Sequence, residues 1–496
     1  MILTIYKNLR NVFFILFLII SIYAAKFYEG SVVIFFLYCA SFIWMVFFLT
    51  NNKSSYFEIF FSSYLFLGFW FKYVFSLILY KGIVYDAGNA SQHTNIDDVL
   101  SIGILVANTC FISSFLSKKF FHYKILKYDL ANQQFFFQQF YLNNRILLLL
   151  LLLIFCVFLA YINNKFTIYQ RGLISLVETS DLINNFIKWF LLFGLTTLTC
   201  FFLHVEILKQ KKINFLTVII SIFVTFASYT SMLSRLFPII GMAIILPLYQ
   251  QSKKLKKSYD KLFFLILMIF LFLTAMSIYY SNYIRIEKSN EINNELKNMQ
   301  NAESLQDIKD LRQTNINNPK IKEDKTSENL TSNNITSFII VNRWIGIESI
   351  ILVHKSKKTS FSLFLESLKE KKKLNIEETF YEKTFGLDKI NVATNSKLQK
   401  GNTLPGIIGF LYYSGNLYFV LIILFLIIFI FNFFEIFIKQ ITRENSIFAC
   451  FISSLIATRL IHFGYVPKDS YLFIISVLSA VFIMCFLLRF RLLCKK

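Results

Sequence analysis

The sequence predicts an all-α polytopic membrane protein with about 12 transmembrane helices and one large, partly helical loop outside the membrane. Hydrophobic residues make up 56% of the 496 residues, and the mean hydropathy is +0.57. Several apolar runs reach the roughly 20 residues that cross a bilayer as a helix. These runs are continuous, whereas the strands of a membrane barrel alternate between apolar and polar residues. A soluble fold would have to bury more long apolar runs than one core can hold.

The apolar windows predict the spans in chain order. They lie near 11–25, 31–50, 58–80, 99–117, 146–162, 186–206, 213–232, 236–250, 262–281, 407–438, 446–463 and 470–488. The first window follows Lys7 and Arg10 as in a signal peptide, but a second window follows directly, so we interpret it as an uncleaved first helix. The windows on either side of Arg235 are joined by almost no loop, which leaves 11 spans as the alternative.

The distribution of Lys and Arg predicts the orientation. With twelve spans both termini lie on one side, and the connections on that side hold most of the cations. The principal ones are Lys53, Lys118, Lys119, Lys124, Lys127, Arg145, Lys209, Lys211, Lys212, Lys253, Lys254, Lys256, Lys257, Lys261, Lys439, Arg443, Arg489, Arg491, Lys495 and Lys496. The positive-inside rule therefore predicts cytoplasmic termini.

One long polar segment, predicted outside, interrupts the spans. Its part 287–334 is rich in Asn, Lys and Glu and poor in aromatics, which predicts a flexible insert. A helical part, 338–373, follows it, with one helix over 338–353 and a second over 360–373. The chain is thus divided into spans 1–9 (1–281), the loop (282–405) and spans 10–12 (406–496).

Composition also limits the chemistry. The formal charge of +22 lies in short loops beside the spans, so it reflects topology and not a nucleic-acid surface. The seven cysteines form no CxxC motif and no Cys/His cluster, so neither a disulfide framework nor a zinc site is indicated. Because the chain has neither a P-loop nor a dinucleotide fingerprint, no cofactor is predicted.

Several cations fall at or near the opposite, outer boundary of the spans. They are Lys72, Arg171, Arg235, Arg285 and Arg459. Cations kept against the topological bias indicate an anionic ligand, and a guanidinium can bind two phosphate oxygens at once. His462 follows Arg459 by three residues and so shares its helix face. The alternatives are snorkelling side chains, the interpretation we favour for Lys72, or structural ion pairs.

The loop adds candidates for catalysis in NRWIGIESIILVH. Arg343 could hold a phosphate, and either Glu348 or His354 could act as general base for a sugar hydroxyl. The alternative for each is a solvated loop residue. An earlier acidic pair, Asp97 and Asp98, could hold a divalent cation, but capping of the next helix explains it better.

Three segments resemble the Wzy-type oligosaccharide repeat-unit (O-antigen) polymerases and the O-antigen ligase superfamily. They are YQRG at Tyr169–Gly172, SRLFPIIGMAIILPLY at Ser234–Tyr249, and a late outer loop that ends in NTLPGIIGFLYYSGN at Asn402–Asn416. The resemblance implies a metal-independent glycosyltransferase that moves a glycan from an undecaprenyl pyrophosphate carrier onto a second lipid-linked glycan. It implies that Arg171 and Arg235 hold the pyrophosphate and that Arg343 binds donor or acceptor. It also implies membrane lipid as a partner and, as further partners, a chain-length regulator and a flippase, but no nucleic acid.

Two alternatives remain open. An O-antigen ligase, or another glycosyltransferase with a lipid-linked sugar donor, would share the same donor chemistry. A polysaccharide or lipid transporter would also need a cationic cavity, but transporters often contain repeated halves and helices broken at the membrane midplane. The chain shows no internal repeat and gathers its polar residues in one outer loop, which favours an enzyme.

Overall fold

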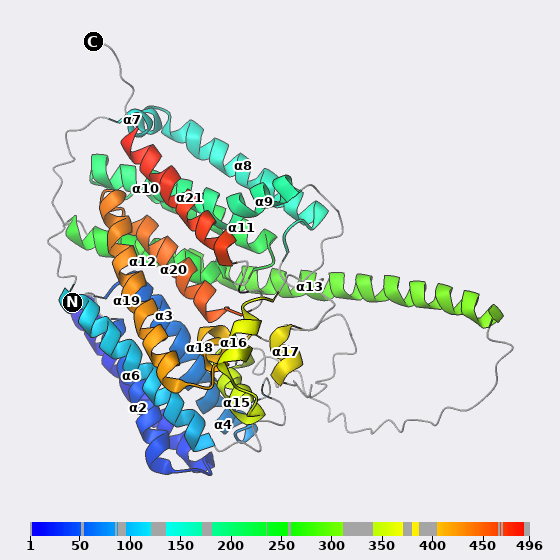
Figure 1. The fold of residues 1–496 in the computed structure, drawn as a ribbon. Coiled ribbons are helices and arrows are strands. Elements are labelled where there is room, and N and C mark those ends of the chain that lie inside the picture. The colour runs from blue at the N-terminus through cyan, green and yellow to red at the C-terminus, as the bar shows by residue number, and fades with distance from the viewer. Residues whose placement is uncertain are drawn as a thin grey trace.

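The structure is a computed structural model of the chain. It describes residues 2–50, 54–84, 87, 96–120, 135–170, 181–234, 236–255, 259–310, 341–370, 379–385, 404–464, 467 and 470–490. All regular secondary structure in these ranges is helical. The predicted fold class is confirmed to this extent: the protein is all-α, with many apolar helices (Figure 1).

The helices form in the predicted order. Before the loop they are α1 (Ile2–Ala24), η1 (Ala25–Phe27), α2 (Val32–Leu49), α3 (Tyr56–Phe66), the π segment η2 (Leu67–Phe71), α4 (Lys72–Tyr80), α6 (Ile96–Phe120), α7 (Phe136–Asn143), α8 (Arg145–Phe166), α9 (Asp181–Trp189), the π segment η4 (Phe190–Gly194), α10 (Leu195–Gln210), α11 (Phe215–Ser231), α12 (Phe237–Lys254) and α13 (Asp260–Asp310). The loop holds α15 (Ile347–Ser356), α16 (Phe361–Ser367) and α17 (Phe380–Phe385), and α18 (Gly406–Tyr412), α19 (Leu417–Ile441), α20 (Ser446–Ile461) and α21 (Ser470–Arg489) complete the chain.

Eight helical stretches of the described residues are long and apolar enough to cross a membrane. They are Val32–Leu49, Tyr56–Tyr80, Ile96–Phe120, Arg145–Phe166, Ile183–Gln210, Asp260–Ile284, Leu417–Ile441 and Ser470–Arg489. Three shorter apolar helices match further predicted windows: Asn11–Phe27, Phe215–Ser231 and Ser446–Ile461. α12 covers the remaining predicted window, 236–250, and carries Pro247 within it. The protein is therefore a polytopic membrane protein.

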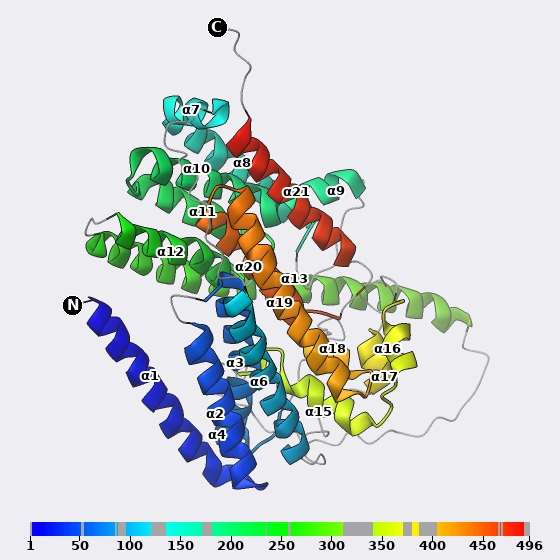
Figure 2. The same cartoon turned by 60° about the vertical axis from the view of Figure 1, so that its left-hand side comes forward.

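The helices pack in two groups joined by a central layer. α2 lies against α6 and α3 in one group, while α8 lies against α11 in the other. α20 contacts both α3 and α12, and α19 packs on α6, so these helices connect the groups (Figures 1 and 2). α15, α16, α17 and α18 gather around one end of the bundle, beside the start of α19 (Figure 2). We call this end the loop end.

Buried carboxylates stabilise the opposite end of several helices. Glu58 accepts hydrogen bonds from Ser114 and Asn432 and pairs with Lys118 at 3.2 Å. Glu435 accepts from the Phe57 amide and Ser453 and lies beside Lys439.

A third such pair joins α8 to α10. Arg145 lies 2.6 Å from Glu206, whose carboxylate also accepts from Tyr141 and Thr217. The cations of all three pairs belong to the set that predicted the cytoplasmic side. Each offsets the desolvation of a carboxylate at a helix end, where an unpaired charge would be costly.

The loop differs from its prediction in two places. α13 continues as helix to Asp310, so residues 287–310 of the predicted flexible insert are helical, while 311–334 lie outside the described residues. No Gly or Pro interrupts α13, and its polar half is rich in the helix formers Glu, Lys, Leu and Gln.

The predicted helix over 338–353 is broken. Residues 343–346 leave the helical path and α15 begins only at Ile347. The predicted span 407–438 is also divided, into α18 and α19, at Gly415, whose φ of 67° favours glycine. Both breaks place backbone groups at the loop end.

Candidate functional site

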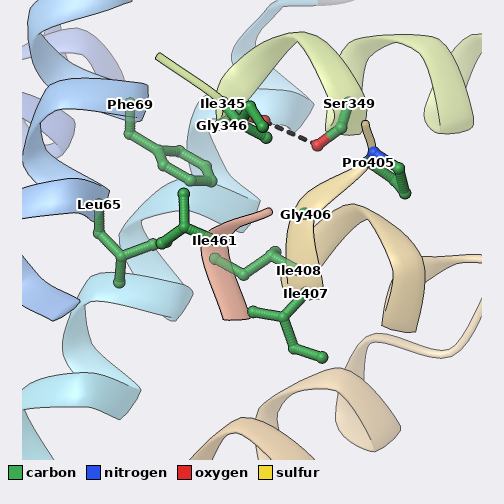
Figure 3. A pocket seen from close by; sticks show the side chains of 10 residues that line it. All are labelled: Leu65, Phe69, Ile345, Gly346, Ser349, Pro405, Gly406, Ile407, Ile408 and Ile461. Carbon is green, nitrogen blue, oxygen red and sulfur yellow. Dashed lines mark hydrogen bonds between the residues drawn. The ribbon is translucent and has the colours of Figure 1, made fainter. Parts of the chain in front are cut away.

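Four parts of the chain meet at the loop end around one small cavity. Its walls come from the middle of the α3–η2–α4 span, the break before α15, the start of α18 and the last residue of α20 (Figure 3). The lining residues are Leu65, Phe69, Ile345, Gly346, Ser349, Pro405, Gly406, Ile407, Ile408 and Ile461. The cavity of about 10 Å³ has room for roughly one water molecule, so it is a packing joint and not a substrate site.

A buried ion pair fixes the loop to the span on one side of this joint. Lys72 Nζ lies 3.1 Å from Glu348 Oε2, and the exposed fractions of the two side chains are 0% and 5%. Lys72 also donates to the Trp344 carbonyl at 2.8 Å. The interpretation of Lys72 as a snorkelling cation is therefore wrong, because its amino group points into the protein and binds the loop.

The carboxylate of Glu348 is engaged on both oxygens. The Gly346 amide donates to Oε1 and Oε2 at 3.1 and 3.0 Å. Glu348 thus binds the free backbone before its own helix and neutralises Lys72 at the same time. These contacts suit a residue that positions the loop, because a general base has to reach the acceptor hydroxyl with an oxygen.

Two glycines allow the loop backbone to touch the span. A Cβ on Gly346 would overlap the carbonyl of Gly68, and a Cβ on Gly68 would overlap the carbonyl of Ile345. Gly68 lies in the π segment η2, and π segments of this kind often occur at functional sites. Ser349 Oγ donates to the Gly346 carbonyl at 2.7 Å and completes the turn (Figure 3).

The end of α20 carries two more candidates to the same joint. Tyr64 of α3 donates to Thr458 Oγ1 at 2.7 Å, since that hydroxyl itself donates to the Ser454 carbonyl. His462 Nδ1 donates to the Thr458 carbonyl at 2.9 Å, and its ring lies edge-on to Tyr64. Arg459 is half-buried and donates to Ser470 at the start of α21. His462 and Arg459 are thereby held near Ile461, a wall of the cavity.

His354, the third candidate from the loop, lies in a separate group of side chains. His354 Nδ1 and the Tyr412 hydroxyl are 3.0 Å apart, and His354 Nε2 lies 3.8 Å from Asp98 Oδ2. The side chains of His354 and Asp98 are 31% and 57% exposed. Burial, and then the charge of Asp98, raise the pKa of Tyr412, so its hydroxyl stays protonated at neutral pH.

The two residues of the acidic pair, Asp97 and Asp98, have different partners. Asp97 accepts from Tyr28 and from the Ser31 amide, contacts that join α6 to the connection before α2. Burial and the hydrogen bond to Asp97 raise the pKa of Tyr28, which keeps its hydroxyl a donor. Asp98 instead faces the loop histidine. Both residues lie in the first turn of α6, the position at a helix N-terminus that the sequence suggested.

The remaining candidates are placed in part. Arg343 is half-buried in the break before α15, next to Trp344, whose carbonyl binds Lys72. Arg171 and Arg235 lie outside the described residues. The backbone of Arg285 continues α13, and its side chain also lies outside the described part. The structure thus places Arg343 and Glu348 in the segment that forms one wall of the cavity, Arg459 and His462 beside another lining residue, Ile461, and His354 partly exposed farther along α15.

Comparisons of the chain with protein-family models, with curated proteins and with solved structures find no match. The chemistry of the site is therefore argued from its residues. Guanidinium groups beside a rigid joint can bind an anion, and an imidazole between a hydroxyl and a carboxylate can accept a proton. Sequence reasoning missed Lys72 as the partner of Glu348, and Asp98 and Tyr412 as the partners of His354. The one signal in advance was the position of Lys72 inside an apolar run.

Proposed function

We propose that the protein polymerises undecaprenyl-pyrophosphate-linked oligosaccharide repeat units, by glycosyl transfer at the outer face of a bacterial inner membrane. The loop end is then the periplasmic end, twelve helices cross the membrane, and both termini are cytoplasmic. The observation that supports the proposal is the packing of the segment that carries Arg343 against the end of α20, which carries Arg459 and His462: Ile345 and Ile461 line the same cavity. His354, farther along α15, is partly exposed. Residues more than a hundred positions apart thus lie where a lipid-linked headgroup would arrive.

The roles proposed for the arginines rest on their charge and on the resemblance to the Wzy-type polymerases. Arg171, Arg235 and Arg285 bind the pyrophosphate of the donor, and Arg459 and Arg343 extend this cationic surface. A departing pyrophosphate carries growing negative charge, which fixed guanidinium groups stabilise more strongly near a low-dielectric membrane than in water.

His354 is the better of the two proposed general bases. In the tautomer with the proton on Nδ1, this nitrogen donates to the Tyr412 hydroxyl and Nε2 keeps a lone pair beside Asp98. It can take the proton of the acceptor sugar hydroxyl, and the resulting imidazolium is stabilised by Asp98, 3.8 Å away. Glu348 remains in its pair with Lys72 and holds the segment that carries Arg343.

A deletion strain tests the reaction class. Loss of a polymerase leaves single repeat units on the lipid acceptor, loss of a ligase leaves no attached glycan, and loss of a transporter leaves unpolymerised donor at the inner face. We expect single repeats, and we expect the chain expressed from a plasmid to restore the long polymer. A strain that lacks all attached glycan would favour the ligase and reject the polymerase.

A further inference from the structure

The loop helix α16 exposes an apolar stripe. Phe361, Leu365 and Leu368 are spaced at i, i+4 and i+7 and are 53%, 45% and 38% exposed. Phe364, on the same side, is buried against Phe410. The apolar face of α16 is therefore packed against the protein at Phe364 and exposed at Phe361, Leu365 and Leu368.

The position of α16 along α19 gives its height in the membrane. The rings of Phe361 and Phe364 lie 5.7 and 5.3 Å from the ring of Phe419, in the first turn of α19. From Phe419 to Lys439 the helix rises about 30 Å at 1.5 Å per residue, which equals the thickness of the hydrocarbon core. Because Lys439 marks one boundary of the bilayer, α16 lies at the other.

Beside α16, helix α19 presents an exposed apolar face of the kind that contacts lipid in a membrane protein. Tyr418 and Ile422 of α19 are 78% and 60% exposed, and Leu426 and Ile430 continue the same outward stripe. A tyrosine at the end of an apolar span is typical of the interface between hydrocarbon and headgroups. The stripe of α16 continues this band sideways.

Charge complements the apolar stripe. Residues 355–370 contain four lysines and two glutamates. All four lysines are exposed: Lys355, Lys357, Lys358 and Lys369. Glu366 is exposed and lies roughly 100° around the helix from Leu365, outside the stripe. Glu370 accepts from the Phe380 amide. Lysines that flank an apolar helix face match the phosphate groups of lipids.

We propose that α16 is a membrane-docking element that inserts Phe361, Leu365 and Leu368 into the leaflet at the loop end, with its lysines bound to anionic lipid headgroups. α15 precedes α16 by only four residues, so this docking holds His354 at the height of the headgroups. The surface is independent of the reaction proposed above. A lipid occupant is favoured over a second copy of the chain because the stripe is continuous with the lipid-facing band of α19.

Site-specific photocrosslinking of the full-length chain tests the docking. A benzoylphenylalanine replaces Leu365 in one variant and Glu366, roughly 100° around the same helix and outside the stripe, in the matched control. Both proteins are placed in nanodiscs that contain labelled phosphatidylglycerol. We expect at least fivefold more lipid adduct at position 365 than at 366.

Equal labelling at the two positions would overturn the proposal, and so would capture of a second copy of the chain at position 365. The charge component is tested with Lys357→Gln/Lys358→Gln on the Leu365 photoprobe. We expect the adduct with phosphatidylglycerol to fall by about half or more, and the adduct with phosphatidylcholine to stay the same. An equal change with both lipids would overturn the role of the lysines.

Discussion

Removal of the buried amino group of Lys72 is expected to release the loop from the span. In Lys72→Met, Glu348 at 4% exposure loses a cation 3.1 Å away, and the Trp344 carbonyl loses a donor. Breaking a buried pair by removing one partner costs about 3–5 kcal/mol. Since 1.4 kcal/mol is a factor of ten, the local opening constant should rise roughly a hundredfold to several thousandfold.

Hydrogen exchange of the full-length protein in nanodiscs measures this opening directly. The amides of α15 should exchange faster by that factor in Lys72→Met, while those of α8 and α11, which lie outside the joint, should not change. Lys355→Met is the matched control, because Lys355 is an exposed lysine of α15, the helix whose exchange is measured.

A double variant separates the ion pair from general damage. Lys72→Met/Glu348→Gln removes both charges, so its exchange should return to within about tenfold of the natural protein. The reasoning would be refuted if Lys72→Met changed exchange less than fivefold, or if the double variant exchanged as fast as the single one.

Further variants test the remaining roles. Arg235→Ala should abolish polymer at unchanged expression, whereas Arg235→Lys should restore it in part because the two-pronged contact is lost; full polymer from the alanine variant would exclude the role. His354→Ala should lower the rate of transfer by roughly 10²- to 10⁴-fold, and Asp98→Asn by less; an unchanged rate in His354→Ala would exclude it as the base. Gly346→Ala should destabilise the joint by about 1–3 kcal/mol, seen as faster exchange in α15, because its Cβ meets the backbone of Gly68; exchange like that of the natural protein would show that the contact is dispensable.

The sequence was sufficient for the helices whose length the bilayer dictates. The windows 99–117 and 470–488 differ by only a few residues from Ile96–Phe120 and Ser470–Arg489. A continuous apolar run of about 20 residues has few alternatives to a membrane helix, so local composition predicts it.

The breaks and the site geometry depend on contacts that no local pattern contains. The helix over 338–353 ends at Arg343 because Gly346 packs on Gly68, far away in the sequence. Apolar periodicity cannot reveal this. Lys72 looked like a cation near a membrane boundary, and its partner Glu348 is known only once the loop is folded. The pairing of His354 with Asp98 likewise joins the loop to the start of α6.

The most direct test of the central proposal is a reaction with purified protein. The protein in nanodiscs is given a defined undecaprenyl-pyrophosphate-linked repeat unit, with and without a chelator, and the glycans are separated by length. The account predicts a ladder of polymers joined by new glycosidic bonds, equal in both conditions and absent with Arg235→Ala. Unchanged single repeats with the natural protein, under conditions in which a known polymerase makes a ladder, would contradict it.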